Sequence, residues 1–229
     1  MPPWLNPVFK GVNVADVKSY SEFALIDLLD AFASNDPVPG GGSAAALAGA
    51  LGVSLLVMAA SLSKSRTGAP EEATDLAEAA ARLRPLRDRL VELIDADSSA
   101  YRAVMAALKL PKASEQEQAR RNETLQSALR EATDAPLDVM RSGQQALAGG
   151  VVVARNVYRV AASDVAMGIE LLGASVRGAA LSIDGNLSSI KDGKYVERVS
   201  RERGQLSDDS ARDAALALDA VSGSPRSRP

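Results

Sequence analysis

Histidine and cysteine are both absent from this chain of 229 residues. Without cysteine the chain can form neither a disulfide nor a thiolate zinc site. Without histidine it can form no Ser-His-Asp triad, no histidine metal site and no imidazole acid–base pair. Any acid–base catalysis therefore depends on Asp, Glu, Lys, Tyr or a group of the substrate, and we expect no bound metal.

Aromatic residues and basic clusters are also scarce. Aromatic residues make up 3% of the chain against 46% hydrophobic residues, and Ala is abundant, which suits close helix-on-helix packing. The net charge of −3 and the lack of a basic block argue against a nucleic-acid partner. Residues 1–20 lack the plan of a signal peptide, and the apolar run at 44–62 is weakly hydrophobic. We expect a cytoplasmic protein with no membrane segment.

The most distinctive stretch is residues 37–43, with the sequence PVPGGGS, which leads into that apolar run. Ser43 is a good N-cap residue, and the glycines would let a ligand approach the backbone. Free N–H groups at the positive end of a helix would bind an anion, although close helix packing alone could also require such a turn. Because residues 44–62 are apolar or small on every side, we expect a central bundle helix running from about 43 to 64.

The remaining periodicity predicts further helices over 21–32, 71–108, 113–147, 163–187 and 194–221. Pro85 is expected to kink one helix and Pro136 to bend or break another, which Gly149-Gly150 would end. Ser163 or Asp164 would cap the next helix, after a short helix or connector at 151–162. We predict an all-α fold, a single-domain up-and-down bundle of six or seven helices over 21–221, with an extended or disordered arm at 1–20 and a disordered tail at 222–229.

Asp97 interrupts an otherwise apolar helical stripe between Leu93 and Tyr101. Burial would raise the pKa of its carboxyl group, as a general acid at neutral pH requires. Asp95, two residues away, points elsewhere on the helix, so the two carboxylates do not form a dyad. The alternative is a structural aspartate bonded to a neighbouring helix end or to an arginine.

Five segments, in this order, resemble those of the cyclodeaminase/cyclohydrolase family of folate enzymes. They are residues 39–46 (PGGGSAAA); Asp95 and Asp97 with Tyr101; residues 110–112 (LPK) with Glu117, Arg120 and Arg121; residues 135–137 (APL); and Asn156 with Ser163-Asp164, followed by Asn186-Leu187. The likeness covers about residues 21–220.

The resemblance implies an all-helical homodimer that binds folate, with Asp97 as the catalytic acid and no metal or redox cofactor. It implies a substrate site formed by Pro39, Gly40, Gly41, Gly42, Ser43, Tyr101, Lys112, Asn156, Ser163, Asp164 and Asn186. The favoured activity is that of a methenyltetrahydrofolate cyclohydrolase, and the alternative is that of a formiminotetrahydrofolate cyclodeaminase. The chain departs from the family pattern at Arg155, Ser182 and Gly185, which would fit a third hypothesis, a non-catalytic folate-binding dimer.

Overall fold

The structure is a computed structural model that describes residues 19–223. Over these residues it contains six α-helices and two short 3-10 turns and no β-strand, so the predicted all-α fold is confirmed. Most of the predicted arm and tail lies outside the described residues. In chain order the elements are η3 (Tyr20–Glu22), α1 (Leu25–Ala33), α2 (Gly41–Ala60), α3 (Pro70–Leu108), α4 (Glu115–Asn156), η4 (Arg159–Ala161), α5 (Ala162–Leu187) and α6 (Gly193–Ser222).

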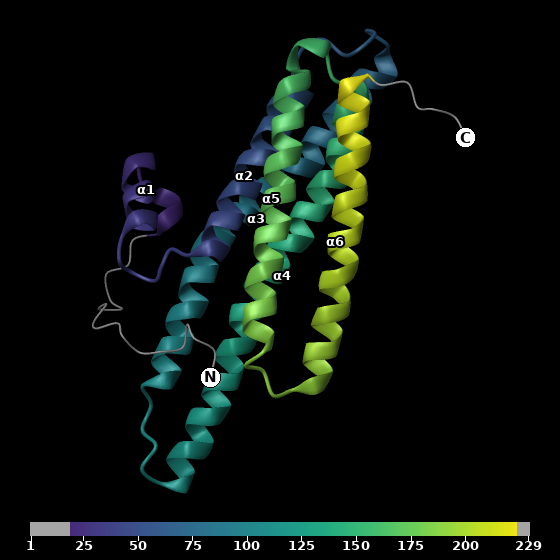
Figure 1. Cartoon of the computed structure of the whole chain (residues 1–229). Helices are drawn as coiled ribbons and strands as arrows, with labels where there is room; N and C mark the ends of the chain where they lie inside the picture. The colour runs from purple at the N-terminus through teal and green to yellow at the C-terminus, as the bar shows by residue number, and fades with distance from the viewer. Residues whose placement is uncertain (1–18, 224–229) are drawn as a thin grey trace.

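Helices α2 to α6 form an elongated bundle, and α1 stands apart from it (Figure 1). Helix α4 contacts all four of the other long helices, whereas α2 packs on α3, α4 and α5. The apolar α2 is therefore not wholly interior: Leu51 is 52% exposed and Met58 41% exposed. The buried side chains of α2 to α6 form one main hydrophobic core.

The two longest helices are not interrupted at their internal prolines or at Gly149-Gly150. Helices α3 and α4 continue through Pro85 and Pro136, because packing against neighbouring helices holds them together. Each proline lacks an N–H and so frees the carbonyl group four residues earlier, that of Ala81 or Ala132. Helix α4 also runs through Gly149-Gly150 to Asn156. A Cβ at Gly150 would lie 2.5 Å from a side-chain carbon of Ile169, so this glycine permits close packing of α5 instead of ending the helix.

Two segments, Gly41–Ala60 and Arg159–Leu187, are long and apolar enough to cross a membrane by length and composition. Both pack within the bundle, and a buried core helix passes the same test. These segments are therefore weak evidence of a membrane span.

Candidate functional site

A cleft of about 360 Å³ opens at the N-terminal end of α2. The loop that precedes α2, the C-terminal third of α3 and the C-terminal part of α5 form its walls. It therefore brings together the glycine loop, Asp97, Tyr101 and Asn186, which are far apart in the sequence. Its lining residues are Pro37, Val38, Gly40, Gly41, Gly42, Asp97, Tyr101, Val104, Ala132, Leu181, Ser182, Gly185 and Asn186.

Ser43 is not the N-cap of α2, contrary to the prediction. The N-cap is Gly40, the helix begins at Gly41, and Ser43 is a fully buried residue of its first turn. The Ser43 Oγ lies 2.8 Å from the carbonyl oxygen of Ile94 and 3.0 Å from Oδ2 of Asp97. The hydroxyl group therefore fastens α2 to α3 instead of closing its own helix.

Asp97 occupies the position in which we expected a bound anion. Its Oδ2 accepts hydrogen bonds from the backbone N–H of Ser43 (2.9 Å) and from the Ser43 hydroxyl (3.0 Å). The positive end of α2 thus faces a carboxylate of the same chain. Burial raises the pKa of Asp97, and the two bonds from Ser43 offset part of that rise because they favour the ionised form. Within residues 19–223, Oδ1 has no hydrogen-bond partner, which leaves it available to a ligand in the cleft.

Gly42 is required for this contact between α2 and α3. A Cβ at position 42 would lie 2.1 Å from Oδ1 of Asp97, closer than non-bonded atoms approach. A Cβ at Gly41, by contrast, would have nothing within 4 Å. One glycine of the three therefore makes room for the carboxyl group.

Asp95 anchors the chain segment that precedes α1, and it forms no dyad with Asp97. Its carboxylate accepts hydrogen bonds from the Ser19 hydroxyl (2.5 Å) and the Tyr20 backbone N–H (2.6 Å). The buried Tyr20 donates its hydroxyl to the carbonyl of Val38 (3.1 Å) and accepts one from Arg102 (3.1 Å). The loop at the cleft is thus held through Tyr20, a residue that sequence periodicity did not single out.

Asn186 is held by the carbonyl group that Pro136 leaves free. The Asn186 Nδ2 donates to the carbonyl oxygen of Ala132 at 2.7 Å. This bond directs a side-chain amide to the cleft and leaves its Oδ1 without a partner among the described residues. Tyr101 supplies the facing wall, and partial burial raises the pKa of its phenol.

Six predicted substrate contacts do not line the cleft of the same chain. Lys112 is exposed in the loop between α3 and α4. Asn156 lies at the C-terminal end of α4, where its Nδ2 donates to Asp75 (3.1 Å). Ser163 and Asp164 are in the first turn of α5, which begins at Ala162 with Ala161 as its N-cap, so neither caps the helix. From there to Asn186 the helix rises roughly 33 Å. The other two, Pro39 and Ser43, are buried directly beside lining residues.

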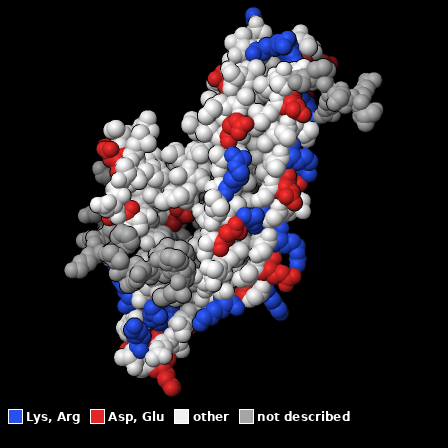
Figure 2. Space-filling model, in the orientation of Figure 1, with Lys and Arg blue, Asp and Glu red and all other residues white. Residues whose placement is uncertain are grey.

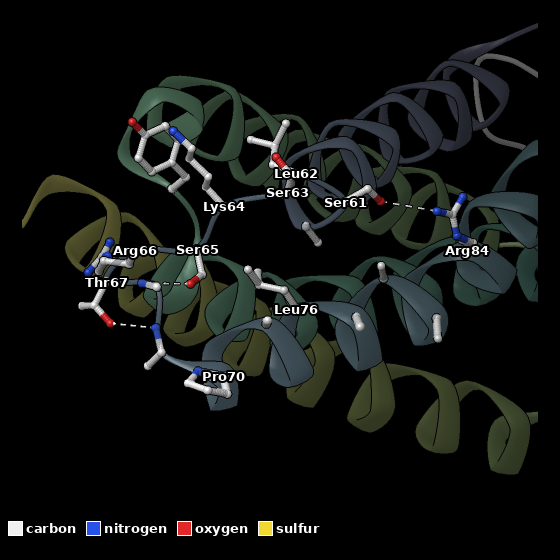
Figure 3. Close-up of a pocket in the computed structure, with 18 residues that line it drawn as sticks. Ser61, Leu62, Ser63, Lys64, Ser65, Arg66, Thr67, Pro70, Leu76 and Arg84 are labelled. Atoms are coloured by element: carbon white, nitrogen blue, oxygen red, sulfur yellow. Dashed lines mark hydrogen bonds between the residues drawn. The ribbon is translucent and has the colours of Figure 1, made fainter.

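A larger cavity of about 1010 Å³ lies at the opposite end of α2 (Figure 3). We call it the α2–α3 groove. The loop that follows α2 and one face of α3 form it, together with Tyr158. Six alanines contribute to its lining, and its charged residues are Lys64, Arg66 and Arg84, with no carboxylate. The Lys64 Nζ lies 5.6 Å from the centre of the Tyr158 ring, and Arg84 donates to the Ser61 Oγ (3.4 Å).

Comparison with known proteins relates this chain to folate enzymes. Residues 24–205 match the model of the formiminotransferase-cyclodeaminase family. The chain is 34% identical over 174 residues to a methenyltetrahydrofolate cyclohydrolase of Methylorubrum extorquens, covering 76% of this chain and 84% of that protein. It is 30% identical over 180 residues to the formimidoyltransferase-cyclodeaminase of Gallus gallus, covering 79% of this chain but 33% of that protein.

The fold is also found in a solved structure. The crystal structure of formiminotetrahydrofolate cyclodeaminase from Thermotoga maritima superimposes with a TM-score of 0.78, at 24% sequence identity. The match covers 88% of this chain and 97% of that one. The fold of this chain is therefore similar to one already seen in a crystal structure.

Proposed function

Because this chain belongs to the formiminotransferase-cyclodeaminase family, we propose that it is an enzyme of folate one-carbon metabolism, a methenyltetrahydrofolate cyclohydrolase. The bacterial cyclohydrolase supports this reaction, since the two chains match over most of both lengths. The chain spans about a third of the avian formimidoyltransferase-cyclodeaminase, so the activity of that whole protein gives weaker support for the function of this chain. The observation that carries the proposal is Asp97, a partly buried carboxyl group with one oxygen free in the cleft.

In the proposed reaction, Asp97 moves a proton between water and N5 of the folate. Water adds to the methenyl carbon, and the Asp97 carboxylate takes one of its protons. The bond from that carbon to N5 then breaks, the Asp97 carboxyl group returns the proton to N5, and the added oxygen becomes the formyl oxygen as its second proton leaves to solvent. The product is 10-formyltetrahydrofolate. A pKa raised by burial suits both steps, because the group must accept and then release a proton near neutral pH.

Replacement of Asp97 tests this role. Asp97→Asn keeps the size of the side chain and an oxygen that accepts from Ser43, but it cannot carry the proton. We expect turnover, followed as loss of the methenyl absorbance above the spontaneous rate, to fall by about 10²- to 10⁴-fold. The control is Asp88→Asn, an exposed aspartate on the same helix that pairs with Arg87, which should retain activity. Unchanged turnover in Asp97→Asn would contradict the proposal.

The pH dependence gives a second readout of the same group. The resting enzyme needs the carboxylate, so kcat/KM should decrease as the pH falls through the pKa of Asp97. Because burial raises that pKa, the decrease should occur above the ordinary aspartate value of about 3.9. In Asp97→Asn the residual rate should lose this dependence.

The alternative reaction is the deamination of formiminotetrahydrofolate, supported by the 30% identity to the avian enzyme. There, N10 attacks the formimino carbon and Asp97 protonates the nitrogen that leaves as ammonia. The two reactions change the methenyl band in opposite directions, so one spectrophotometer distinguishes them. A protein that binds folate but changes neither substrate would be the non-catalytic dimer that Arg155, Ser182 and Gly185 suggest.

A homodimer is part of the proposal, and a surface formed by α2 and α5 supports it. Exposed apolar residues recur every seven positions along α2 and along α5 with the η4 turn that precedes it, the spacing by which helices pack in coiled coils. Figure 2 shows a largely uncharged surface over α2, whereas charged side chains follow α6. Because α2 and α5 pack side by side, we call the two rows together the α2–α5 stripe. It consists of Ala44, Leu51, Met58, Val160, Met167, Ala174 and Leu181.

We also propose that the enzyme works in the cytoplasm without a cofactor or metal, and with no nucleic-acid or membrane partner. The two proton transfers and the ring opening require only water, a carboxyl group and the folate itself. Dialysis against a chelator should therefore leave turnover unchanged.

A further inference from the structure

Helix α1 exposes an apolar and acidic surface that no described part of its own chain covers. Leu25, Ile26 and Leu29 are 70%, 64% and 50% exposed, and Leu28 is its one buried residue. Residues 19–39 carry four carboxylates and neither Lys nor Arg. Asp27 and Asp30 form no ion pair with any residue of the described range. Three large apolar side chains in water on one nine-residue helix indicate a binding surface.

The α2–α3 groove has the complementary properties. Its alanine floor would accept leucine and isoleucine side chains, because alanine leaves space between helices. Lys64, Arg66 and Arg84 supply its charge, and none of them forms an ion pair within residues 19–223. Arg66 is half-buried and already donates to the carbonyls of Ala154 and Ala220, so Lys64 and Arg84 are the available cations.

The positions of the two surfaces decide how two copies would meet. Helix α1 is joined to the N-terminal end of α2 and the groove lies at its C-terminal end, roughly 30 Å away along the 20-residue helix. Helix α1 and the groove lie on one chain but too far apart to meet. If two copies pack their α2–α5 stripes antiparallel about a two-fold axis, each α1 comes to the groove of the other copy. Parallel packing would instead place the two acidic helices side by side, which is unfavourable.

We propose that α1 of one copy docks in the α2–α3 groove of a second copy, so that an antiparallel homodimer exchanges its N-terminal helices. Leu25, Ile26 and Leu29 lie on the alanine floor, and Asp30, beside that face of the helix, faces Lys64 and Arg84. Asp27 lies on the far side of α1 and adds to the negative charge of the docked helix. This arrangement rests on the homodimer proposed above, and it adds the orientation of the two copies and the element that each contributes. Because α1 leads directly into the loop at the cleft, each copy would hold the cleft loop of the other.

Charge exchange tests the contact. Asp27→Lys with Asp30→Lys, and separately Lys64→Glu with Arg84→Glu, should each raise the dimer dissociation constant about tenfold in sedimentation experiments, since attraction becomes repulsion. An equimolar mixture of the two double variants should recover the native dissociation constant, because both contacts in the mixed dimer again join opposite charges. A mixture that stays weak would overturn the proposal.

Crosslinking tests the same contact without reference to charge. The chain has no cysteine, so each introduced thiol reports only its own position. Asp30→Cys protein, enlarged by a tag, is mixed with Ser63→Cys protein and treated with a short bis-maleimide. A heterodimeric product should dominate, whereas Ser200→Cys, an exposed position on α6, should give little when it replaces Ser63→Cys.

Several outcomes would overturn the proposal while leaving the enzymatic function intact. One is a dimer by sedimentation that gives no Asp30–Ser63 product, and another is a protein that stays monomeric. A third is a crosslink from Asp30→Cys to a cysteine placed within residues 1–18 of the same chain, which would assign the α1 surface to that segment. Turnover of methenyltetrahydrofolate, measured on the same samples, tests the proposed reaction independently.

Discussion

The two ends of α2 are built from the same pair of helices and differ in chemistry. At the N-terminal end, α2 and α3 meet at a glycine, a buried serine and a carboxyl group, and the cleft measures about 360 Å³. At the C-terminal end, the loop that follows α2 and one face of α3 bring together alanines and cations, and the groove measures about 1010 Å³. The smaller cavity contains the group that can exchange a proton. Cavity size alone would therefore point to the end of the helix that lacks this carboxyl group.

The serines at the two ends illustrate the same difference. Ser43 is fully buried and its hydroxyl crosses to α3, where it reaches Asp97 and Ile94. Ser61 is exposed, and its hydroxyl donates to Val57 in its own helix (2.7 Å). One hydroxyl therefore tunes a carboxyl group in another helix, while the other closes a helix end.

Gly42→Ala should have the largest effect, because it removes the close contact that defines the N-terminal end. The new Cβ would overlap Oδ1 of Asp97, so the carboxyl group or α2 must shift. We expect turnover to fall about a hundredfold and the free energy of unfolding to fall by about 1–3 kcal/mol. Gly204→Ala on α6, where a Cβ would meet nothing within 4 Å, is the control and should retain both. Full activity in Gly42→Ala would show that the contact is not needed.

Ser43→Ala should have an intermediate effect, and it distinguishes the role of Ser43 from that of Ser61. Loss of a hydroxyl bond to a carboxylate should lower kcat/KM roughly tenfold. Because that bond lowers the pKa of Asp97, its loss should raise this pKa further, and the acidic limb of the pH profile should move to higher pH. Ser61→Ala should leave both the rate and the limb unchanged. Equal effects of the two substitutions would remove the distinction drawn between the ends.

Tyr20→Phe should have the smallest effect, and it tests whether the Tyr20 hydroxyl holds the loop that lines the cleft. The substitution removes the bonds to Val38 and Arg102, and we expect a loss of about 1 kcal/mol in unfolding free energy with a few-fold rise in KM. Tyr195→Phe deletes a phenol that bonds Asp134 (2.6 Å) and does not line the cleft. The control should lose similar stability with no change in KM. A KM change in both variants would mean that the effect is one of general stability.

The sequence was sufficient to predict the helical bundle and to single out Asp97 as a carboxyl group within an apolar helical stripe. The apolar periodicity gave each long helix, because bundle packing buries one stripe of each helix. Asp97 could be singled out because burying a carboxyl group in an apolar stripe is costly unless the group has a bonding partner. Its placement in the cleft is a structural finding, and its catalytic role stays a proposal.

The features that were not predicted depend on contacts between distant segments. Ser43 looked like a cap because it follows three glycines, yet the helix begins before it, and the buried hydroxyl bonds α3 instead. Pro136 was expected to bend or break its helix because its local effect is to remove one hydrogen bond. The carbonyl that it frees is instead used by Asn186, 50 positions further along the chain. The α2–α3 groove was not predicted, since nothing in a run of alanines and a short polar loop shows that the two segments enclose a cavity.

The contact between Gly42 and Asp97 also bears on how relatives of this protein can diverge. With 2.1 Å between a Cβ at position 42 and the carboxyl oxygen, the two positions cannot change independently. A lineage that acquires any side chain at position 42 must move or lose the aspartate, while a lineage that loses the aspartate is released from the glycine. The two positions therefore form a marker for comparing homologues. Homologues that keep both the glycine and the aspartate are candidates for proton-transfer enzymes, and those that have replaced both are candidates for new roles on the same fold.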